Sequence, residues 1–407
     1  MAIENMRVTI MGHAGLFIEG CDQRILVDPV LRTDALGSLS VTHAYPRVLD
    51  LPAMPRPTLI ILTHGHLDHF DPSSLALLDR RIPIVVPDDH AMHCVLRELG
   101  FGTLRVLAPW DFLKAGGIEL RAVPSHADID EFGFVVSAHG LTFLHLADAE
   151  PSLADARKLR AEMGTMDLAS VKFQPASPAH GVFRALGPQF DKNEVAEWLE
   201  CIAEASPRLS FPYASGVRYQ GRHEWLNRYA FPFTSEEVRR LLELRLATTG
   251  PAVTTVLPGD VFEISRYAAV QVPRASTFVR HAGGGEEPAW EPIDSQLLTT
   301  PFTPEERREL DARLEQLLRQ EIGPWIARRS RDEGSPIQKY MQYGVVYQLT
   351  VHAGRDDALH YSIDYSAPRL SLRSERHPCA NYFAHLSGRA LLEVLRGSAG
   401  PELFYMS

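Results

Sequence analysis

The chain has 407 residues, 45% of them hydrophobic, which is enough to bury a large core in a main domain and to form a smaller accessory one. The formal net charge of -10 argues against nucleic acid or an anionic membrane as a partner and favours a small-molecule substrate. No apolar run is as long as a membrane span, no export signal is recognised, and the four separated cysteines suit a cytoplasmic protein.

Short apolar runs that alternate with helical patterns predict an α/β fold for the first part of the chain. We expect strands at residues 8–10, 24–27, 59–63, 82–86, 117–123, 133–137 and 141–146. We expect helices after Asp71-Pro72 and at residues 88–99, 151–163, 191–205 and 234–246. Two sheets with the helices outside them would form an αββα sandwich.

A Gly/Pro-rich acidic stretch begins at Gly283 and suggests a linker. We therefore assign residues 1–282 to a catalytic domain, 283–300 to the linker and 301–407 to an accessory α+β domain of unknown role. In this last part a capping box at Thr303 predicts a helix, residues 345–351 and 359–364 predict strands, and residues 387–395 predict a final helix. Whether the chain forms a homo-oligomer is left open.

The segment His64-Gly65-His66-Leu67-Asp68-His69 directly follows a predicted buried strand. Three imidazoles and a carboxylate in six residues would each need a separate buried partner if they were structural, so they indicate metal ligands. In an extended chain His64 and His66 point to one side and can reach one ion, while Asp68 and His69 lie where the chain turns and can address a second. The motif thus predicts a dinuclear centre.

Further ligands are expected where other predicted strands end. His126 follows the strand at residues 117–123, and Asp148 ends the run from Phe143. A carboxylate at the end of a strand can bridge two ions. His126 and Asp148 are therefore candidate ligands.

These features together resemble the metallo-β-lactamase superfamily of metal-dependent hydrolases. The resemblance spans roughly residues 6–265 and includes Gly12-His13-Ala14-Gly15 and the run from Ile25 to Pro29 as well as the motif and the two strand ends. It implies that His64, His66 and His126 hold one metal, that Asp68 and His69 hold the second, and that Asp148 bridges them.

The superfamily completes the second metal with one more histidine, and this sequence departs from that pattern. The corresponding segment runs from Ser210 to Gly216 and has Ala214 where the histidine is expected. Either His223 or His180 could supply the ligand instead, and His223 is the assignment we favour.

The stretch from Phe211 to Asn227 also resembles, more loosely, the metal domain of the CMP-N-acetylneuraminate hydroxylase group. Members of that group are oxygenases with an N-terminal Rieske domain. No CxH and CxxH pair is present in this chain, so an oxygenase would need an electron-transfer partner.

Two divalent cations lower the pKa of a water towards neutrality, which makes hydroxide available as a nucleophile. We therefore expect a metal-dependent hydrolase of an ester, amide, lactone or phosphoester. Asp68 would orient the hydroxide or carry a proton to the leaving group, besides binding metal. Zinc is the first expectation, with iron and manganese as alternatives, and a non-haem di-iron oxygenase is the alternative function.

Overall fold

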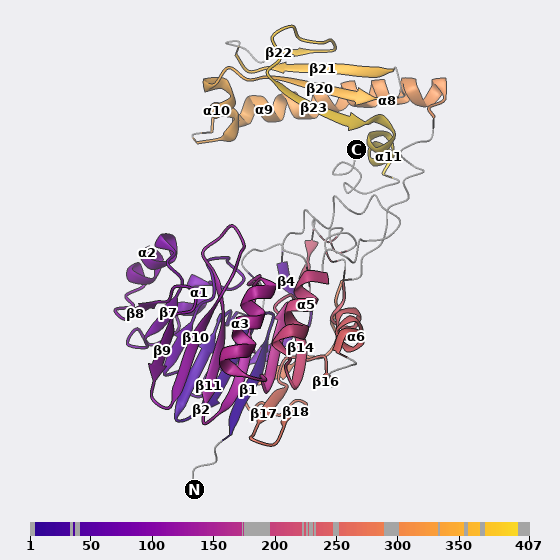
Figure 1. Cartoon of the computed structure of the whole chain (residues 1–407). Helices are drawn as coiled ribbons and strands as arrows, with labels where there is room; N and C mark the ends of the chain where they lie inside the picture. The colour runs from indigo at the N-terminus through magenta and orange to yellow at the C-terminus, as the bar shows by residue number, and fades with distance from the viewer. Residues whose placement is uncertain are drawn as a thin grey trace. The chain divides into compact units, whose positions relative to one another are not determined.

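The computed structural model describes residues 5–32, 36, 41–172, 174, 196–221, 224, 227, 231, 233–246, 252–288, 301–332, 334–353, 357–366 and 371–397. Figure 1 shows the whole chain. The described residues form two compact units, one reaching to residue 288 and the other starting at residue 301. Residues 283–288, which the sequence assigns to the linker, belong to the first unit.

The first unit contains an 8-stranded sheet. Its strands, in spatial order, are β18 (Ala269–Val272), β17 (Val261–Ile264), β1 (Met6–Gly12), β2 (Gly15–Gly20), β3 (Gln23–Val27), β6 (Leu59–Ile61), β7 (Ile84–Val86) and β8 (Leu104–Val106). Strands β3, β6, β7 and β8 run parallel, so their carboxyl ends meet at one edge of the sheet.

A 7-stranded sheet faces the first. Its order is β16 (Ala252–Val253), β14 (Leu209–Tyr213), β13 (Leu168–Lys172), β12 (Leu141–His145), β11 (Phe132–Ala138), β10 (Ile118–Pro124) and β9 (Phe112–Ala115). Two small ladders join β15 (Val217–Tyr219) to β4 (Val41–His43) and β19 (Val279–His281) to β5 (Arg47–Leu49). The strands of the second sheet from β12 to β16 pair in parallel.

Alternation along the strands divides the core into layers. In β12, Phe143 packs between the two sheets with Val8 and Ile10 of β1, whereas its neighbour Leu144 packs on the outer face of the second sheet. On the first sheet, Ile61 points into the shared core and Ile60 points outward. Each sheet therefore buries both of its faces, which needs helices outside.

Helices cover both outer faces, as the αββα prediction requires (Figure 1). The helices α1 (Pro72–Leu75) and α2 (His90–Glu98) pack on the first sheet. The helices α3 (Leu153–Met163), α5 (Ala196–Ala205) and α6 (Ser235–Leu246) pack on the second. Asp71 caps α1 as predicted, but the helix ends at Leu75 and is shorter than the sequence suggests.

The second unit is an α+β structure, as predicted. A 4-stranded sheet has the order β22 (Ser371–Arg373), β21 (Ala358–Asp364), β20 (Val346–His352) and β23 (Tyr382–Ser387). Its helices are α8 (Pro304–Leu317), the π-helix η3 (Leu318–Ile322), α9 (Gly323–Arg329), α10 (Pro336–Gln342) and α11 (Gly388–Arg396). The predicted capping box at the start of α8 is present, since Thr303 and Glu306 cap one another. No helix in the described parts of either unit is long and apolar enough to cross a membrane.

Candidate metal centre

The candidate site lies where strands of both sheets end. Strands β3 and β6 are parallel, so Asp28, directly after β3, reaches Thr63, two residues after β6. The main-chain nitrogen of Phe132 in the second sheet lies 3.3 Å from the carbonyl oxygen of Thr63, which brings the two sheets together at this point. The predicted loop after β6 is therefore held at the meeting edge of the sheets.

The loop from His64 to His69 turns back on itself. The carbonyl of His66 accepts hydrogen bonds from the main-chain nitrogens of His69, at 3.0 Å, and Phe70, at 2.7 Å. Gly65 fits because a Cβ atom there would lie 2.8 Å from a carboxylate oxygen of Asp89, which caps helix α2. This turn directs the three histidine rings towards a common centre.

The first group of candidate ligands contains His64, His66, His69 and Asp148. Nε2 of His64 lies 3.0 Å from Nδ1 of His66 and 4.0 Å from a carboxylate oxygen of Asp148. Nε2 of His69 lies 3.6 Å from the other oxygen of Asp148. His64 and His69 are fully buried, whereas His66 and Leu67 are exposed, so the group opens to solvent on one side.

A second group contains His13, Asp68 and His69. One ligand atom from each of the three lies within 4.8 Å of the others, and the same holds for His64, His69 and Asp148. Nε2 of His13 lies 3.2 Å from a carboxylate oxygen of Asp68. The two groups share His69, so the described residues offer two adjoining places for a cation.

A buried carboxylate, Asp28, positions His69 from behind, and a second one, Glu131, lies near His64. Asp28 accepts hydrogen bonds from the main-chain nitrogen of Thr63 (2.8 Å), its hydroxyl (2.7 Å) and Nδ1 of His69 (2.9 Å). Because a carboxylate only accepts, Nδ1 of His69 carries a proton and Nε2 faces Asp148. A carboxylate oxygen of Glu131 lies 3.9 Å from Nδ1 of His64.

The electrostatics of the site follow from these contacts. Burial would lower the pKa of His69, but Asp148 and the hydrogen bond to Asp28 outweigh it and raise that pKa to about 10. Burial, followed by the charge of His69, lowers the pKa of His64 well below its ordinary value. The pKa of Asp68 also lies well below its usual range, because His13 and His69 outweigh the effect of burial. Asp68 is therefore a carboxylate, and His64 is neutral as a metal ligand must be.

The residues present fit a bound cation. Among the described residues, the buried Nε2 of His69 and both ring nitrogens of His13 have no hydrogen-bond partner of normal geometry. Buried polar atoms without a partner are costly, and a cation would satisfy them. Imidazole with carboxylate is a donor set for zinc, iron or manganese.

Several residues near the site adopt a left-handed backbone that side chains other than glycine rarely take. They are His13 (φ 50°), Asp28 (φ 40°), Ala147 (φ 49°) and Ala214 (φ 63°). Each lies at or just after the end of a strand in the first unit. The strand ends at this edge are therefore held in an unfavourable conformation by their surroundings.

The structure does not bring His126 into either group. Its Nε2 lies 2.7 Å from Oδ2 of Asp155, and its side chain is 61% exposed. Only its main chain is close, since its nitrogen donates to the carbonyl of Glu150, two residues beyond Asp148. His126 as a ligand stays a prediction, and it requires the ring to leave Asp155.

The two candidates for the missing ligand, His223 and His180, lie outside the described residues. The assignment of His223 therefore stays a prediction. Ala214, where the superfamily has its histidine, is 4% exposed and directly follows β14.

Three residues with a role at the site were not predicted from the sequence. Asp28 had a readable signal, a carboxylate directly after an apolar strand. For His13, which belongs to Gly12-His13-Ala14-Gly15, the sequence leaves two interpretations open, a pocket-lining residue or a hydrogen-bonding residue of the first hairpin, and the second was preferred. Glu131 had no local signal, because only the approach of the second sheet brings it near His64.

Two layered sheets covered by helices, with histidines and carboxylates gathered at the strand ends, define an αββα protein with a candidate dinuclear centre. Residues 7–173 match the model of the Beta-lactamase superfamily domain. The resemblance inferred from the sequence is confirmed.

Each of two relatives with curated names matches less than half of the chain. A protein of Mycolicibacterium smegmatis named as a Rieske 2Fe-2S iron–sulfur protein is 30% identical over 185 residues, which are 42% of this chain and 35% of the relative. The UPF0173 metal-dependent hydrolase YtkL of Bacillus subtilis is 25% identical over 206 residues, 48% of this chain and 81% of the relative. The chain thus spans about a third of the length of the first relative.

Among solved structures, CmlA, a diiron beta-hydroxylase from Streptomyces venezuelae, is similar at 19% identity and a TM-score of 0.46. The similarity covers 65% of this chain and 54% of CmlA.

Proposed function

We propose that this chain is a metal-dependent hydrolase of a small molecule with an ester, amide, lactone or phosphoester bond. The observation that carries the proposal is the pair of ligand groups that share His69 at the meeting edge of the two sheets. The named hydrolase relatives support it.

The proposed centre supplies two kinds of chemistry. Bound divalent cations provide a water of lowered pKa and positive charge for the oxygen that becomes negative in the transition state. His64, His66 and Asp148 would hold one ion, and Asp68 and His69, through its free Nε2, would contribute to the second. Zinc is the first candidate for the metal, and iron and manganese are the alternatives.

Asp68 is the proposed catalytic residue. Its pKa is held well below the usual range, so it is charged and would orient the attacking hydroxide, besides binding metal. The substrate would enter from the side where His66 and Leu67 are exposed. Asp28 and Glu131 do not reach this open side and would act only by holding His69 and His64 in place.

Elemental analysis of the protein purified without added metal tests the proposal, together with a panel of nitrophenyl esters, phosphodiesters, lactones and amides. We expect about two metal ions per chain, hydrolysis of one substrate class, and loss of both properties in His66→Ala and Asp148→Ala. His90→Ala, an exposed histidine on α2, is the control and should change neither. A folded protein that binds no metal would refute the proposal.

A di-iron oxygenase is the second candidate function. It is favoured by the relative named as a Rieske iron–sulfur protein and by the looser resemblance of residues 211–227 to the hydroxylase group. An electron-transfer partner would then be required. Iron in the purified protein, with dioxygen uptake in the presence of a reductant and no hydrolysis, would favour the oxygenase; zinc with hydrolysis would exclude it.

The remaining expectations are part of the same proposal. A small molecule, rather than nucleic acid or a membrane, would be the substrate, because the chain is acidic overall. Cytoplasmic location and a homo-oligomer remain hypotheses.

A further inference from the structure

We infer that His13 supplies the second ion's missing imidazole, taking the place of the histidine that the superfamily has at the position of Ala214. This inference rests on the proposed function, because it presupposes a dinuclear centre. His13, near the start of the domain sequence, would then be the last ligand of the second ion in place of His223 or His180.

The first argument is the geometry of the ligand atoms. His13 forms a group with Asp68 and His69, the two residues that the superfamily pattern gives to the second ion. Nε2 of His13 lies 3.2 Å from the carboxylate of Asp68, and the rings of His13 and His69 have centroids 4.9 Å apart. In the superfamily pattern the second ion is bound by an aspartate and a histidine like Asp68 and His69, together with one further histidine. His13 would be that further histidine.

The second argument is the state of the His13 ring. The residue is 5% exposed, yet neither ring nitrogen has a hydrogen-bond partner of normal geometry in the described part of the chain. An imidazole that only stabilised the hairpin would bond to the main chain of its turn. The buried ring of His13 instead faces a carboxylate and another imidazole, which is the usual surrounding of a metal ligand.

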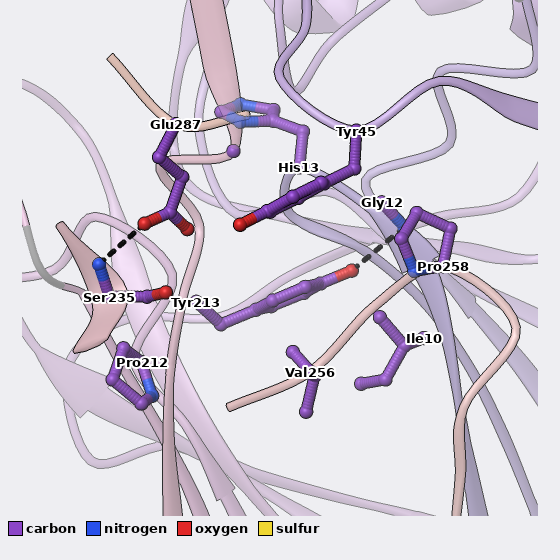
Figure 2. A pocket seen from close by; sticks show the side chains of 11 residues that line it. Ile10, Gly12, His13, Tyr45, Pro212, Tyr213, Ser235, Val256, Pro258 and Glu287 are labelled. Carbon is purple, nitrogen blue, oxygen red and sulfur yellow. Dashed lines mark hydrogen bonds between the residues drawn. The ribbon is translucent and has the colours of Figure 1, made fainter. Parts of the chain in front are cut away.

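The third argument is the position of the turn that carries His13. The hydroxyl of Tyr213, the residue before Ala214, accepts a hydrogen bond from the nitrogen of Gly12 (3.0 Å) and donates one to the carbonyl of Gly15 (2.7 Å). Figure 2 shows Tyr213 bonded to Gly12, with His13 lining the same small pocket. Both ends of the turn are thus fixed by the strand that leads to Ala214.

The main chain beyond Ala214 packs directly on the same turn. A Cβ atom on Gly216 would lie 3.4 Å from Cα of His13, so the two segments touch. The guanidinium of Arg47, 4% exposed, donates to the carbonyls of Met11 and Val30 and so ties the turn to the loop after Asp28. Positions 13 and 214 therefore lie on two touching segments, and an imidazole on either segment could serve the second ion.

The test compares two substitutions with the same backbone requirement. His13 (φ 50°) and His139 (φ 52°) are both left-handed, and His139 is exposed in the turn between β11 and β12. Asparagine tolerates this conformation, so His13→Asn and His139→Asn have similar backbone costs but differ in their relation to the site. Circular dichroism and thermal unfolding establish that both variants fold.

Metal content after dialysis and titration with Zn²⁺ against a competing chelator are the readouts. We expect two ions in the wild type and in His139→Asn. In His13→Asn we expect one ion, with the second bound more than about a hundredfold more weakly, beyond the usual cost of an outer partner. His223→Ala and His180→Ala should each retain two ions.

A further variant tests the exchange of positions. Ala214→His in the His13→Asn background places an imidazole where the superfamily has one, and histidine tolerates the left-handed conformation of residue 214. We expect the second ion to return, and a double variant that still holds one ion would overturn the exchange.

The outcomes separate this inference from the proposed function. A His13→Asn protein that holds two ions at wild-type affinity, or loss of the second ion in His223→Ala or His180→Ala, would overturn the assignment of His13 while leaving the dinuclear centre standing. A wild-type protein that binds no metal would overturn both.

Discussion

Histidines gather in both units of the molecule, but their surroundings differ. In the first unit, His64 and His69 are fully buried, and carboxylates lie beside them on both sides of each ring. In the second unit, His352 of β20 and His385 of β23 are exposed and stack on one another, with Nε2 and Nδ1 2.8 Å apart. Both units therefore bring histidine rings together, but the burial and the charges around those rings differ.

The difference shows what makes a group of histidines a metal centre. The nearby His360 of the second unit has its pKa lowered by burial and then by Arg376, whose cation would also repel a metal ion. In the first unit, negative carboxylates attract a cation, and Asp28 fixes the ring of His69 before any ion arrives. Charge and rigidity, more than residue type, distinguish the two places.

The largest expected effect follows from the loss of His69, which offers Nε2 to a cation and donates Nδ1–H to Asp28. His69→Ala should remove the second ion and leave the buried carboxylate of Asp28 without its imidazole, which costs about 3–5 kcal/mol of folding stability. Elemental analysis and urea unfolding measure the two effects. If His69→Ala kept both ions at full affinity, His69 would not be a metal ligand.

A smaller loss is expected when the partner behind the ring is altered. Asp28→Asn should weaken metal binding about 10- to 100-fold, because the amide fixes the ring of His69 less firmly. Asp167→Asn is a matched control, since Asp167 is buried and bonds to the nitrogen and hydroxyl of Thr142 as Asp28 does to Thr63, but at the other end of β12. Equal metal affinities in the two variants, measured with a competing chelator, would show that Asp28 does not position a ligand.

Metal binding should depend on pH through His69. Its pKa of about 10 means that the metal-free ring holds two protons at neutral pH, and ligation through Nε2 releases one. Metal affinity should therefore rise about tenfold per pH unit around neutrality. Calorimetry in two buffers of different ionisation enthalpy would detect the released proton, and an absence of release would contradict the assignment.

The raised pKa of His69 also predicts how the stability of the metal-free protein changes with pH. Because the folded pKa is raised above the ordinary value of 6.5, the contribution of His69 is fully present below that value and is lost as the pH rises through about 10. The midpoint of thermal unfolding of the metal-free protein should fall as the pH rises from about 6.5 to about 10. In His69→Ala the part of this fall that is due to His69 should be absent.

The smallest effect is expected in the second unit. The double variant His352→Ala and His385→Ala should retain the same number of ions as the wild type after dialysis, because this pair belongs to no group of three candidate ligands among the described residues. Elemental analysis of the dialysed protein measures this directly. Loss of a tightly held ion in that variant would remove the contrast between the two units.

Much of the fold was readable from periodicity. The strand before His64 and the helices that became α2, α3 and α6 were predicted close to their observed places, because their apolar residues repeat clearly and their caps are marked by Asp89, Ser152 and Thr234. Several strands were missed. Among them are β2, which begins and ends at glycines, and β13.

The site was predictable to the extent that it is local in sequence. His64 to His69 and Asp148 could be found because residue type and position after a strand are visible in the chain. The place of His126 could not be predicted, since the capping residue of α3, Asp155, competes for its ring from 29 residues away. His13 could not be assigned either, because residues far away in the sequence, among them Tyr213, fix its turn.

The left-handed residues around the centre have a consequence for engineering. Each such conformation costs about 1–3 kcal/mol, so Ala147→Gly and Ala214→Gly would relax the backbone locally. The protein would then become more stable to heat, while Asp148 and the neighbouring turn would become more mobile. At these two alanines a gain in thermal stability would therefore come with weaker metal binding. Stabilising substitutions should be made elsewhere in the sandwich.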